Sequence, residues 1–135
     1  MMFVRNAVLS TLLLAASAGS ALADGDATKG KSLFGQCRAC HTLEAGRSSG
    51  LGPNLFAIVG REVAAVSAFN YSPSYKQAKE KGVTWTPELI LEYLADPVPF
   101  MRKVSGDPEA KSKMVFKMPK EQDRLDMVEY LKTVK

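Results

Sequence analysis

Two cysteines and one histidine stand together in the segment Cys37-Arg38-Ala39-Cys40-His41, and the chain of 135 residues has no others. Two thiols at this spacing are each able to bond to a vinyl group of one porphyrin, and the histidine that follows directly is placed to ligate the central iron. The segment therefore predicts covalent attachment of one haem through Cys37 and Cys40, with His41 as an axial ligand of the iron.

Other uses of a Cys-x-x-Cys pair explain this segment less well. A dithiol redox pair normally follows a strand in a βαβ pattern, and no such pattern precedes Cys37. A structural zinc ion needs four Cys or His ligands, and the chain has three. A disulfide is compatible with an exported protein, but it would leave His41 without a role.

The first 23 residues have the features of a secretory signal peptide. Arg5 supplies a positive charge, the apolar stretch 7–16 is too short to cross a bilayer, and Ala21-Leu22-Ala23 has the small-x-small pattern of a cleavage site. An uncleaved membrane anchor is the alternative, although serine and glycine residues interrupt the apolar run. We expect residues 24–135 to form one domain in the bacterial periplasm, without stable insertion into the membrane.

Apolar periodicity and capping residues predict an all-α chain. The hydrophobic core of so small a helical domain is thin, so we expect a buried haem to complete it. The polypeptide without haem is expected to fold poorly. Helices are expected from Asp26 towards the Cys-x-x-Cys-His segment, from Ser74 to Lys81, from Thr86 to Asp96, and from Lys120 towards the end of the chain, with a mostly irregular stretch between Val98 and Pro119.

A series of motifs in a fixed order covers nearly all of the expected mature chain. The motifs are Cys37-x-x-Cys40-His41-Thr42, Gly52-Pro53-Asn54-Leu55, Gly60-Arg61, Tyr71-Ser72, Gly82-Val83-Thr84-Trp85, Glu92-Tyr93-Leu94, Lys113-Met114-Val115-Phe116 and Glu129-Tyr130-Leu131-Lys132. This order resembles that of the class I cytochromes c, in particular the bacterial cytochromes c2, which are related to mitochondrial cytochrome c. The resemblance implies a small single-domain fold in which helices wrap around one covalently bound haem.

The second axial ligand is expected to be a methionine, because a thioether raises the reduction potential and favours electron transfer over oxygen chemistry. Met127 lies on the periodic face of the last expected helix, and Met101 follows a short apolar run, so both fit packing roles. Spacing does not distinguish Met114 from Met118. The resemblance selects Met114, which stands in the family motif, and leaves Met118 as the alternative.

The resemblance also implies roles for residues around the haem. The carbonyl oxygen of Pro53 is expected to accept a hydrogen bond from the His41 ring, and Tyr93 is expected to lie near the methionine sulfur. For each aromatic residue, ordinary core packing is the alternative. Donors to a buried haem propionate are expected at Arg61, Tyr71, Trp85 and, more weakly, Ser72. The crossing of the first and last helices is expected at Gly30, Phe34, Met127 and Tyr130.

These features describe a diffusible one-electron carrier rather than an enzyme, because both axial positions of the iron are occupied. The resemblance implies a cytochrome bc1-type complex as electron donor and a photosynthetic reaction centre, terminal oxidase or nitrogen-oxide reductase as acceptor. A haem enzyme or sensor would need an open axial position, and a distal base is hard to find when His41 is the only histidine. A membrane-tethered subunit would need an uncleaved N-terminal segment.

The formal net charge of +4 includes Arg5, and two haem propionates would offset most of the remainder. The position of the lysines therefore matters more than their number. Nucleic acid is excluded as a partner, because no basic stripe is interleaved with aromatic residues, and we expect a monomer. Lysines expected near the haem edge are Lys31, Lys111, Lys113, Lys117 and Lys120. Of these, the resemblance supports Lys113 and Lys120 in docking to acidic partner surfaces, with a solvated lysine-rich surface as the alternative.

Overall fold

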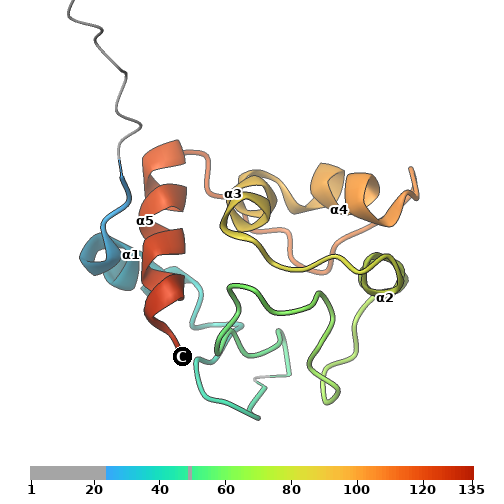
Figure 1. Cartoon of the computed structure of the whole chain (residues 1–135), viewed down its shortest axis with the longest axis horizontal. Helices are drawn as coiled ribbons and strands as arrows, with labels where there is room; N and C mark the ends of the chain where they lie inside the picture. Colours follow the sequence, from blue (N-terminus) through green and yellow to red (C-terminus); the bar gives the residue numbers. More distant parts are fainter. Residues whose placement is uncertain (1–23, 49) are drawn as a thin grey trace, which may run out of the picture.

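The computed structural model describes residues 24–48 and 50–135, so the expected signal peptide, residues 1–23, lies outside the described residues. Within the described ranges the chain is helical, and its extended pairing is limited to one isolated bridge between Glu62 and Thr84. The expectation of an all-α fold is confirmed. The elements are α1 (Ala27–Leu33), the 3-10 helix η1 (Phe34–Gln36), α2 (Pro73–Glu80), α3 (Pro87–Ala95), α4 (Pro97–Ser105) and α5 (Glu121–Thr133) (Figure 1).

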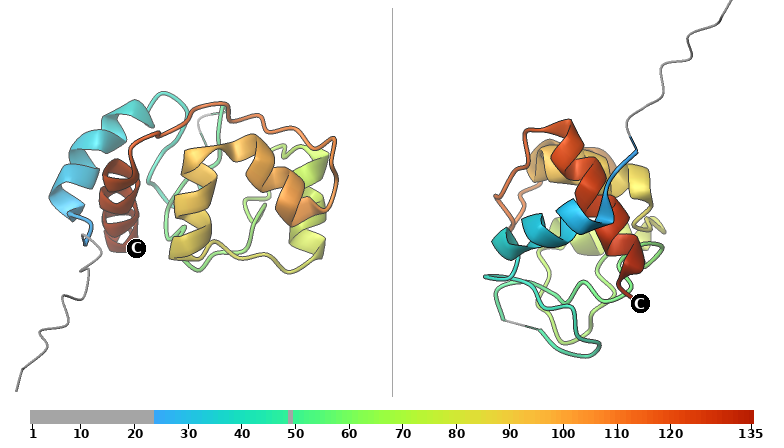
Figure 2. Two further views of the ribbon diagram at one scale, coloured as in Figure 1. Left: turned by 90° about the horizontal axis from the view of Figure 1, so that it is seen from above. Right: turned by 90° about the vertical axis from the view of Figure 1, so that its left-hand side faces the viewer.

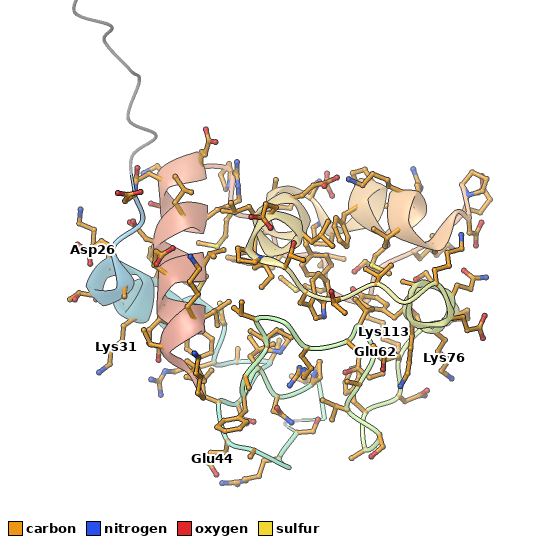
Figure 3. The ribbon with its side chains drawn as sticks, in the orientation of Figure 1. Asp26, Lys31, Glu44, Glu62, Lys76 and Lys113 are labelled. Carbon is orange, nitrogen blue, oxygen red and sulfur yellow. The ribbon has the colours of Figure 1, made fainter. Side chains whose placement is uncertain are left out.

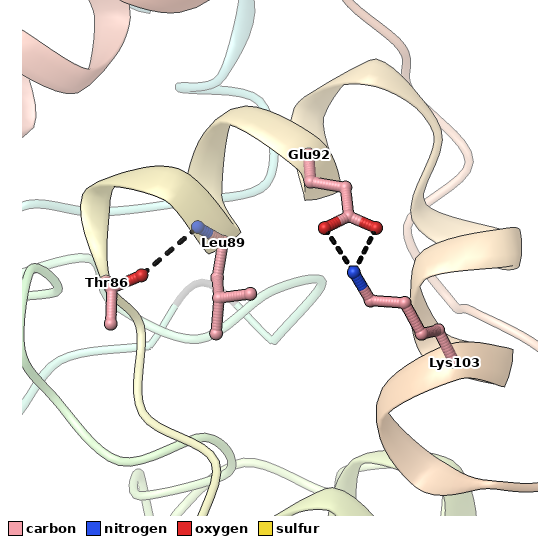
Figure 4. A network of polar contacts seen from close by, with 4 residues as sticks. All are labelled: Thr86, Leu89, Glu92 and Lys103. Carbon is pink, nitrogen blue, oxygen red and sulfur yellow. Dashed lines mark hydrogen bonds and ion pairs between the residues drawn. The ribbon is translucent and has the colours of Figure 1, made fainter.

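Residues that cap helices explain where α1 and α3 begin. The Asp26 carboxylate accepts a hydrogen bond from the Thr28 N–H at 2.8 Å, and it precedes α1. The Thr86 hydroxyl accepts one from the Leu89 N–H at 3.2 Å, and a proline follows at the first position of α3 (Figure 4). Both contacts satisfy N–H groups that have no partner within the helix. Lys120 occupies the N-cap position of α5, so these three helix starts agree with the sequence.

The expectation of a mostly irregular chain from Val98 to Pro119 holds for residues 106–119 but missed α4, which occupies Pro97–Ser105. Asp96 does end α3, but its carboxylate also accepts a hydrogen bond from the Val98 N–H at 3.3 Å, so the same residue caps the next helix. Pro97 then fits the first turn, where its missing N–H has no cost. The helix ends at Gly106, whose φ of +75° is the left-handed conformation that glycine adopts readily.

Helix α4 closes one side of the core. Phe100 and Met101 are 2% and 0% exposed, so Met101 is a helical core residue rather than a packing residue of a loop. On the outer side, the Lys103 ammonium contacts both carboxylate oxygens of Glu92 at 2.6 and 2.5 Å, which connects α4 to α3 (Figure 4). The expected short helix after Tyr71 is also present, as α2.

Helices α1 and α5 cross closely at one end of the molecule (Figure 2). A Cβ atom on Gly30 would lie 2.0 Å from the carbonyl oxygen of Asp126, so only glycine permits this approach. The rings of Phe34 and Tyr130 pack beside the crossing, with centroids 5.6 Å apart. The Asp26 N–H donates to Asp126 Oδ1 at 2.8 Å and joins positions 100 residues apart. The expected helix crossing is therefore present.

The remaining helices frame the long irregular part of the chain, residues 41–48 and 50–72. Helix α3 packs against both α4 and α5, and α2 packs against α4. Figures 1 and 2 show residues 41–48 and 50–72 passing along one side of this helical frame. In the ranges 24–48 and 50–135, no helix combines the length and apolar character needed to cross a membrane.

Candidate haem site

A cavity of about 310 Å³ lies between the helical frame and the irregular residues 41–48 and 50–72. Apolar side chains from both ends of the chain form much of its wall, among them Phe34, Leu55, Ile58, Ile90, Leu94 and Leu131. Such a wall with few polar groups suits a flat, largely apolar cofactor. The cavity brings together all the residues expected to hold or surround a haem: Cys37, Cys40, His41, Pro53, Arg61, Tyr71, Ser72, Trp85, Tyr93 and Met114.

The Cys-x-x-Cys-His segment makes one tight turn directly after η1. The Cys37 carbonyl oxygen accepts hydrogen bonds from the N–H groups of Cys40 at 3.1 Å and His41 at 2.9 Å. This turn places both thiols and the imidazole on the same cavity wall. Cys37 is half-buried and Cys40 is exposed, so the thiol side of the cavity faces solvent. Burial raises the pKa of the Cys37 thiol, and the nearby Cys40 raises it further.

The imidazole of His41 is held in a defined orientation. Its Nδ1 lies 2.7 Å from the Pro53 carbonyl oxygen, and because a carbonyl only accepts, Nδ1 carries the hydrogen. The lone pair is then on Nε2, the atom available to a metal. Burial lowers the pKa of His41, which favours the neutral ring, whereas the Pro53 hydrogen bond opposes this shift. A Cβ on Gly52 would lie 2.7 Å from His41 Cε1, so glycine is needed beside the ring.

Arg61 brings an unpaired buried donor to the cavity wall. Its Nη1 donates to Asn54 Oδ1 at 3.0 Å and to the Phe56 carbonyl at 2.9 Å, and its Nη2 donates to the Asn54 carbonyl at 2.7 Å. Its Nε is buried and has no hydrogen-bond partner among the described residues. A buried guanidinium N–H of this kind is costly unless an acceptor meets it. A carboxylate in the cavity, such as a haem propionate, is an acceptor of the right charge.

Tyr71 and Trp85 line the cavity together with Arg61. Tyr71 is half-buried, and its phenol oxygen accepts a weak hydrogen bond from the Val66 N–H at 3.4 Å. Burial raises the pKa of Tyr71, so the phenol keeps its hydrogen for donation. Trp85 is 8% exposed and stacks on Phe100 at 5.7 Å. The structure thus places both aromatic residues at the cavity and also gives Trp85 a packing role.

Tyr93 belongs to a hydroxyl network that the sequence did not indicate. Its phenol oxygen lies 2.5 Å from that of Tyr75, which in turn lies 2.7 Å from Ser112 Oγ. Burial raises the pKa of Tyr93 well above its ordinary value, and the contact with Tyr75 adds to this rise. Tyr75 lines the cavity but was not among the expected site residues, because no motif or spacing sets it apart from a core tyrosine.

The methionines differ in their position relative to the cavity. Met114 is half-buried and lines it. Met118 is 4% exposed, donates its N–H to the Leu94 carbonyl at 2.8 Å and is not part of the cavity wall. Met127 contributes to the wall from α5, where it is 1% exposed within the core. Of the two candidates that spacing did not separate, Met114 is thus the one that faces the cavity.

Exposed apolar side chains mark the mouth of the cavity. Leu51, Val115 and Phe116, which we call the cavity rim, are 70%, 76% and 38% exposed and belong to the cavity wall. Lys113 lies beside the rim, but its ammonium donates to the Asn70 carbonyl.

The other expected docking lysines lie on several elements. Lys117 forms an ion pair with Asp96 at 2.6 Å. Lys31, Lys111 and Lys120 are exposed. Figure 3 shows Lys31 on α1 and Lys113 close to α2, so these two lysines lie at separate places on the molecule.

Comparison with known proteins agrees with this site. The family model for cytochrome c matches residues 27–135. A cytochrome c2 of Rhodospirillum rubrum is 43% identical over 122 residues, which cover 90% of each chain. A cytochrome c-550 of Novispirillum itersonii is 42% identical over 111 residues, covering 82% of this chain and 100% of the relative. The solved structure of cytochrome c2 from Rhodospirillum centenum superposes with a TM-score of 0.74 at 41% identity, covering 82% of this chain and 98% of the other.

The chain belongs to the cytochrome c family. Its cofactor is a covalently bound haem of the c type, and it serves in electron transfer rather than as an enzyme. The expectations of family, fold and cofactor are confirmed.

Proposed function

We propose that this chain is a soluble, monomeric electron carrier of the periplasm, consisting of residues 24–135 after removal of the signal peptide 1–23. It accepts electrons from a cytochrome bc1-type complex and delivers them to a reaction centre, terminal oxidase or reductase. The observation that carries the proposal is the single cavity wall shared by Cys37, Cys40, His41 and Met114. The similarity of the chain to proteins named cytochrome c2 and cytochrome c-550 supports the same role.

In this proposal Cys37 and Cys40 would form the thioether bonds to the haem, and His41 Nε2 and the Met114 sulfur would ligate its iron. Bound haem supplies an iron atom that gains or loses one electron. The Pro53 carbonyl fixes the imidazole, since its hydrogen bond to Nδ1 leaves only Nε2 to face the cavity. With two protein ligands held in place, substrates are kept from the iron, and little rearrangement accompanies the transfer.

Polar groups on the same wall hold the haem carboxylates and adjust the ligand environment. Arg61 Nε is the buried donor without a partner in the described chain and would pair with a propionate, and Tyr71 and Trp85, which line the same cavity, would donate to that group. Tyr93 lies on the wall that also carries Met114, and its hydroxyl is engaged with Tyr75. A phenol in this place affects the electron density at the methionine sulfur.

In this proposal partners dock at the cavity rim, where exposed apolar side chains border the cavity. Leu51, Val115 and Phe116 supply apolar contact, and Lys113 and Lys120 attract acidic partner surfaces. Because such attraction acts over about 8 Å at physiological ionic strength, association should slow strongly as salt is added.

Visible absorption spectra of the purified holoprotein test the proposal. Ferric protein with histidine and methionine ligands should be low-spin and show the weak far-red sulfur–iron band, and ferrous protein should not bind carbon monoxide readily. Met114→Ala should abolish the band, whereas Met118→Ala and Met127→Ala should retain it. A high-spin ferric spectrum or ready binding of carbon monoxide by the unaltered protein would contradict the carrier function and indicate an enzyme or a sensor.

A further inference from the structure

The segment that carries Met114 has no helix or strand of its own, because residues 111–120 lie between α4 and α5. Backbone hydrogen bonds hold its flanks, from Ala110 N–H to the Asp107 carbonyl and from Met118 N–H to the Leu94 carbonyl. The position of Met114 between these two points therefore depends on side chains from other parts of the chain.

Helix α2 supplies two of these side chains, Ser74 and Tyr75, which we call the α2 clamp. Ser74 Oγ donates to the Lys111 carbonyl at 2.8 Å, across 37 residues of sequence. The Tyr75 phenol oxygen lies 2.7 Å from Ser112 Oγ. Both residues are buried, at 4% and 8% exposure. Two successive residues of α2 thus contact two successive residues of the segment, Lys111 and Ser112, which Lys113 separates from Met114.

The hydroxyl hydrogen of Ser74 is directed to this segment rather than to the helix itself. Ser72 is the N-cap residue of α2, yet its side chain makes no capping hydrogen bond. Its Oγ instead lies 3.1 Å from Ser74 Oγ. Because Ser74 has one hydroxyl hydrogen and gives it to the Lys111 carbonyl, Ser72 must be the donor in this pair. A serine at a helix start normally caps the helix, whereas the Ser72 hydroxyl here donates to Ser74 and leaves the Ser74 hydroxyl hydrogen to the Lys111 carbonyl.

The hydrogen bond from Ser74 is part-buried, because Ser74 is buried whereas Lys111 is exposed. Removing the Ser74 hydroxyl leaves the Lys111 carbonyl without that donor and so removes one fixed point of the segment. Helix α2 is itself packed on α4, so the clamp fixes the segment to the rigid part of the fold. Without it, the segment between Ala110 and Met118 gains conformations in which Met114 leaves the cavity.

We propose that Ser74 is a positioning residue for Met114: its hydroxyl fixes the Lys111 carbonyl and so keeps the methionine sulfur at the cavity. The inference rests on the proposed axial ligation by Met114. Tyr75 supports the same segment through Ser112 and connects it to Tyr93. Ser74 touches neither the cavity nor the cofactor in this assignment, so its effect is transmitted through the backbone of residues 111–114.

The experiment compares Ser74→Ala with Ser105→Ala in the holoprotein. Both serines are 4% exposed, and Ser105 Oγ accepts a hydrogen bond from the Asp107 N–H at the end of α4, outside the clamp. Alanine is a better helix former than serine, so Ser74→Ala should fold. It should weaken the far-red sulfur–iron band and raise the rate of carbon monoxide binding to the ferrous protein about fivefold. Ser105→Ala should match the unaltered protein in both measurements.

Amide hydrogen exchange separates failure of this inference from failure of the proposed function. Exchange at residues 112–115 should accelerate about fivefold in Ser74→Ala and stay unchanged in Ser105→Ala. If the unaltered protein lacks the sulfur–iron band, the proposed ligation by Met114 is refuted. Faster amide exchange in Ser74→Ala would then still show that Ser74 holds the segment. If Ser74→Ala shows unaltered exchange, band intensity and carbon monoxide binding, Ser74 does not position Met114.

Discussion

Replacing Gly30 with alanine tests how closely α1 and α5 must approach. The added methyl carbon would lie 2.0 Å from the Asp126 carbonyl oxygen and 2.7 Å from Tyr130 Cβ, whereas ordinary contact begins at 3.4 Å. The nearest atom belongs to the backbone, so no change of rotamer relieves the overlap. The helices must separate by about 1 Å or more.

The cost follows from what this separation disrupts. Overpacking against backbone costs about 3 kcal/mol, at the upper end of the usual range. Separation also weakens the contact between the Phe34 and Tyr130 rings, now 5.6 Å apart, by about 1 kcal/mol. Alanine returns about 1 kcal/mol through its better helix propensity. We expect Gly30→Ala to lower the free energy of unfolding by about 3 kcal/mol.

Guanidinium unfolding of the holoprotein, followed by far-ultraviolet circular dichroism, measures this change. Gly35→Ala is the matched control, because a Cβ there meets nothing within 4 Å, and it should leave stability within about 1 kcal/mol of the unaltered protein. A loss below about 1 kcal/mol for Gly30→Ala would show that the crossing tolerates a side chain and would refute the argument from close approach.

Three other substitutions test separate features. Hydrogen bonds from the Asp26 N–H and the Gln122 amide lower the pKa of Asp126. The Asp126 carboxylate therefore stabilises the fold above its ordinary pKa and loses this effect as the pH falls through the lowered value. Asp126→Asn should flatten the acid limb of a plot of unfolding free energy against pH. Gly52→Ala should displace the His41 ring and weaken its ligation, which a high-spin ferric spectrum would report. Ala57, with φ of +48°, should gain about 0.5 kcal/mol of stability on replacement by glycine, measured by guanidinium unfolding.

The helix starts were predictable where a capping residue precedes an apolar helical pattern, as at Asp26 and Thr86. The same signal at Asp96-Pro97 was interpreted only as the end of α3. Asp96 ends α3, and its carboxylate also caps the first turn of α4. Because both roles belong to one residue, the sequence shows only one helix boundary there. The spacing of Pro97, Phe100 and Met101 indicated the buried face of a helix, but the two prolines in the run obscured it.

The site was predictable where chemistry requires adjacent residues. Cys37, Cys40 and His41 could be recognised from spacing, because two thioethers and an axial ligand need one short turn. The choice between Met114 and Met118 depends on which side chain faces the cavity, and four residues of irregular chain leave that undetermined. Ser74 contacts a segment 37 residues away, and no local pattern encodes such a pairing.

The contact between α1 and α5 also determines when the molecule closes during synthesis. Its hydrogen bond from Asp26 to Asp126 spans 100 residues, so α1 lacks its packing partner until nearly the whole chain has emerged. A helix of seven residues is not stable alone in water. The Cys37–His41 segment, which follows α1 and η1, therefore stands on an open chain until α5 arrives and completes the crossing.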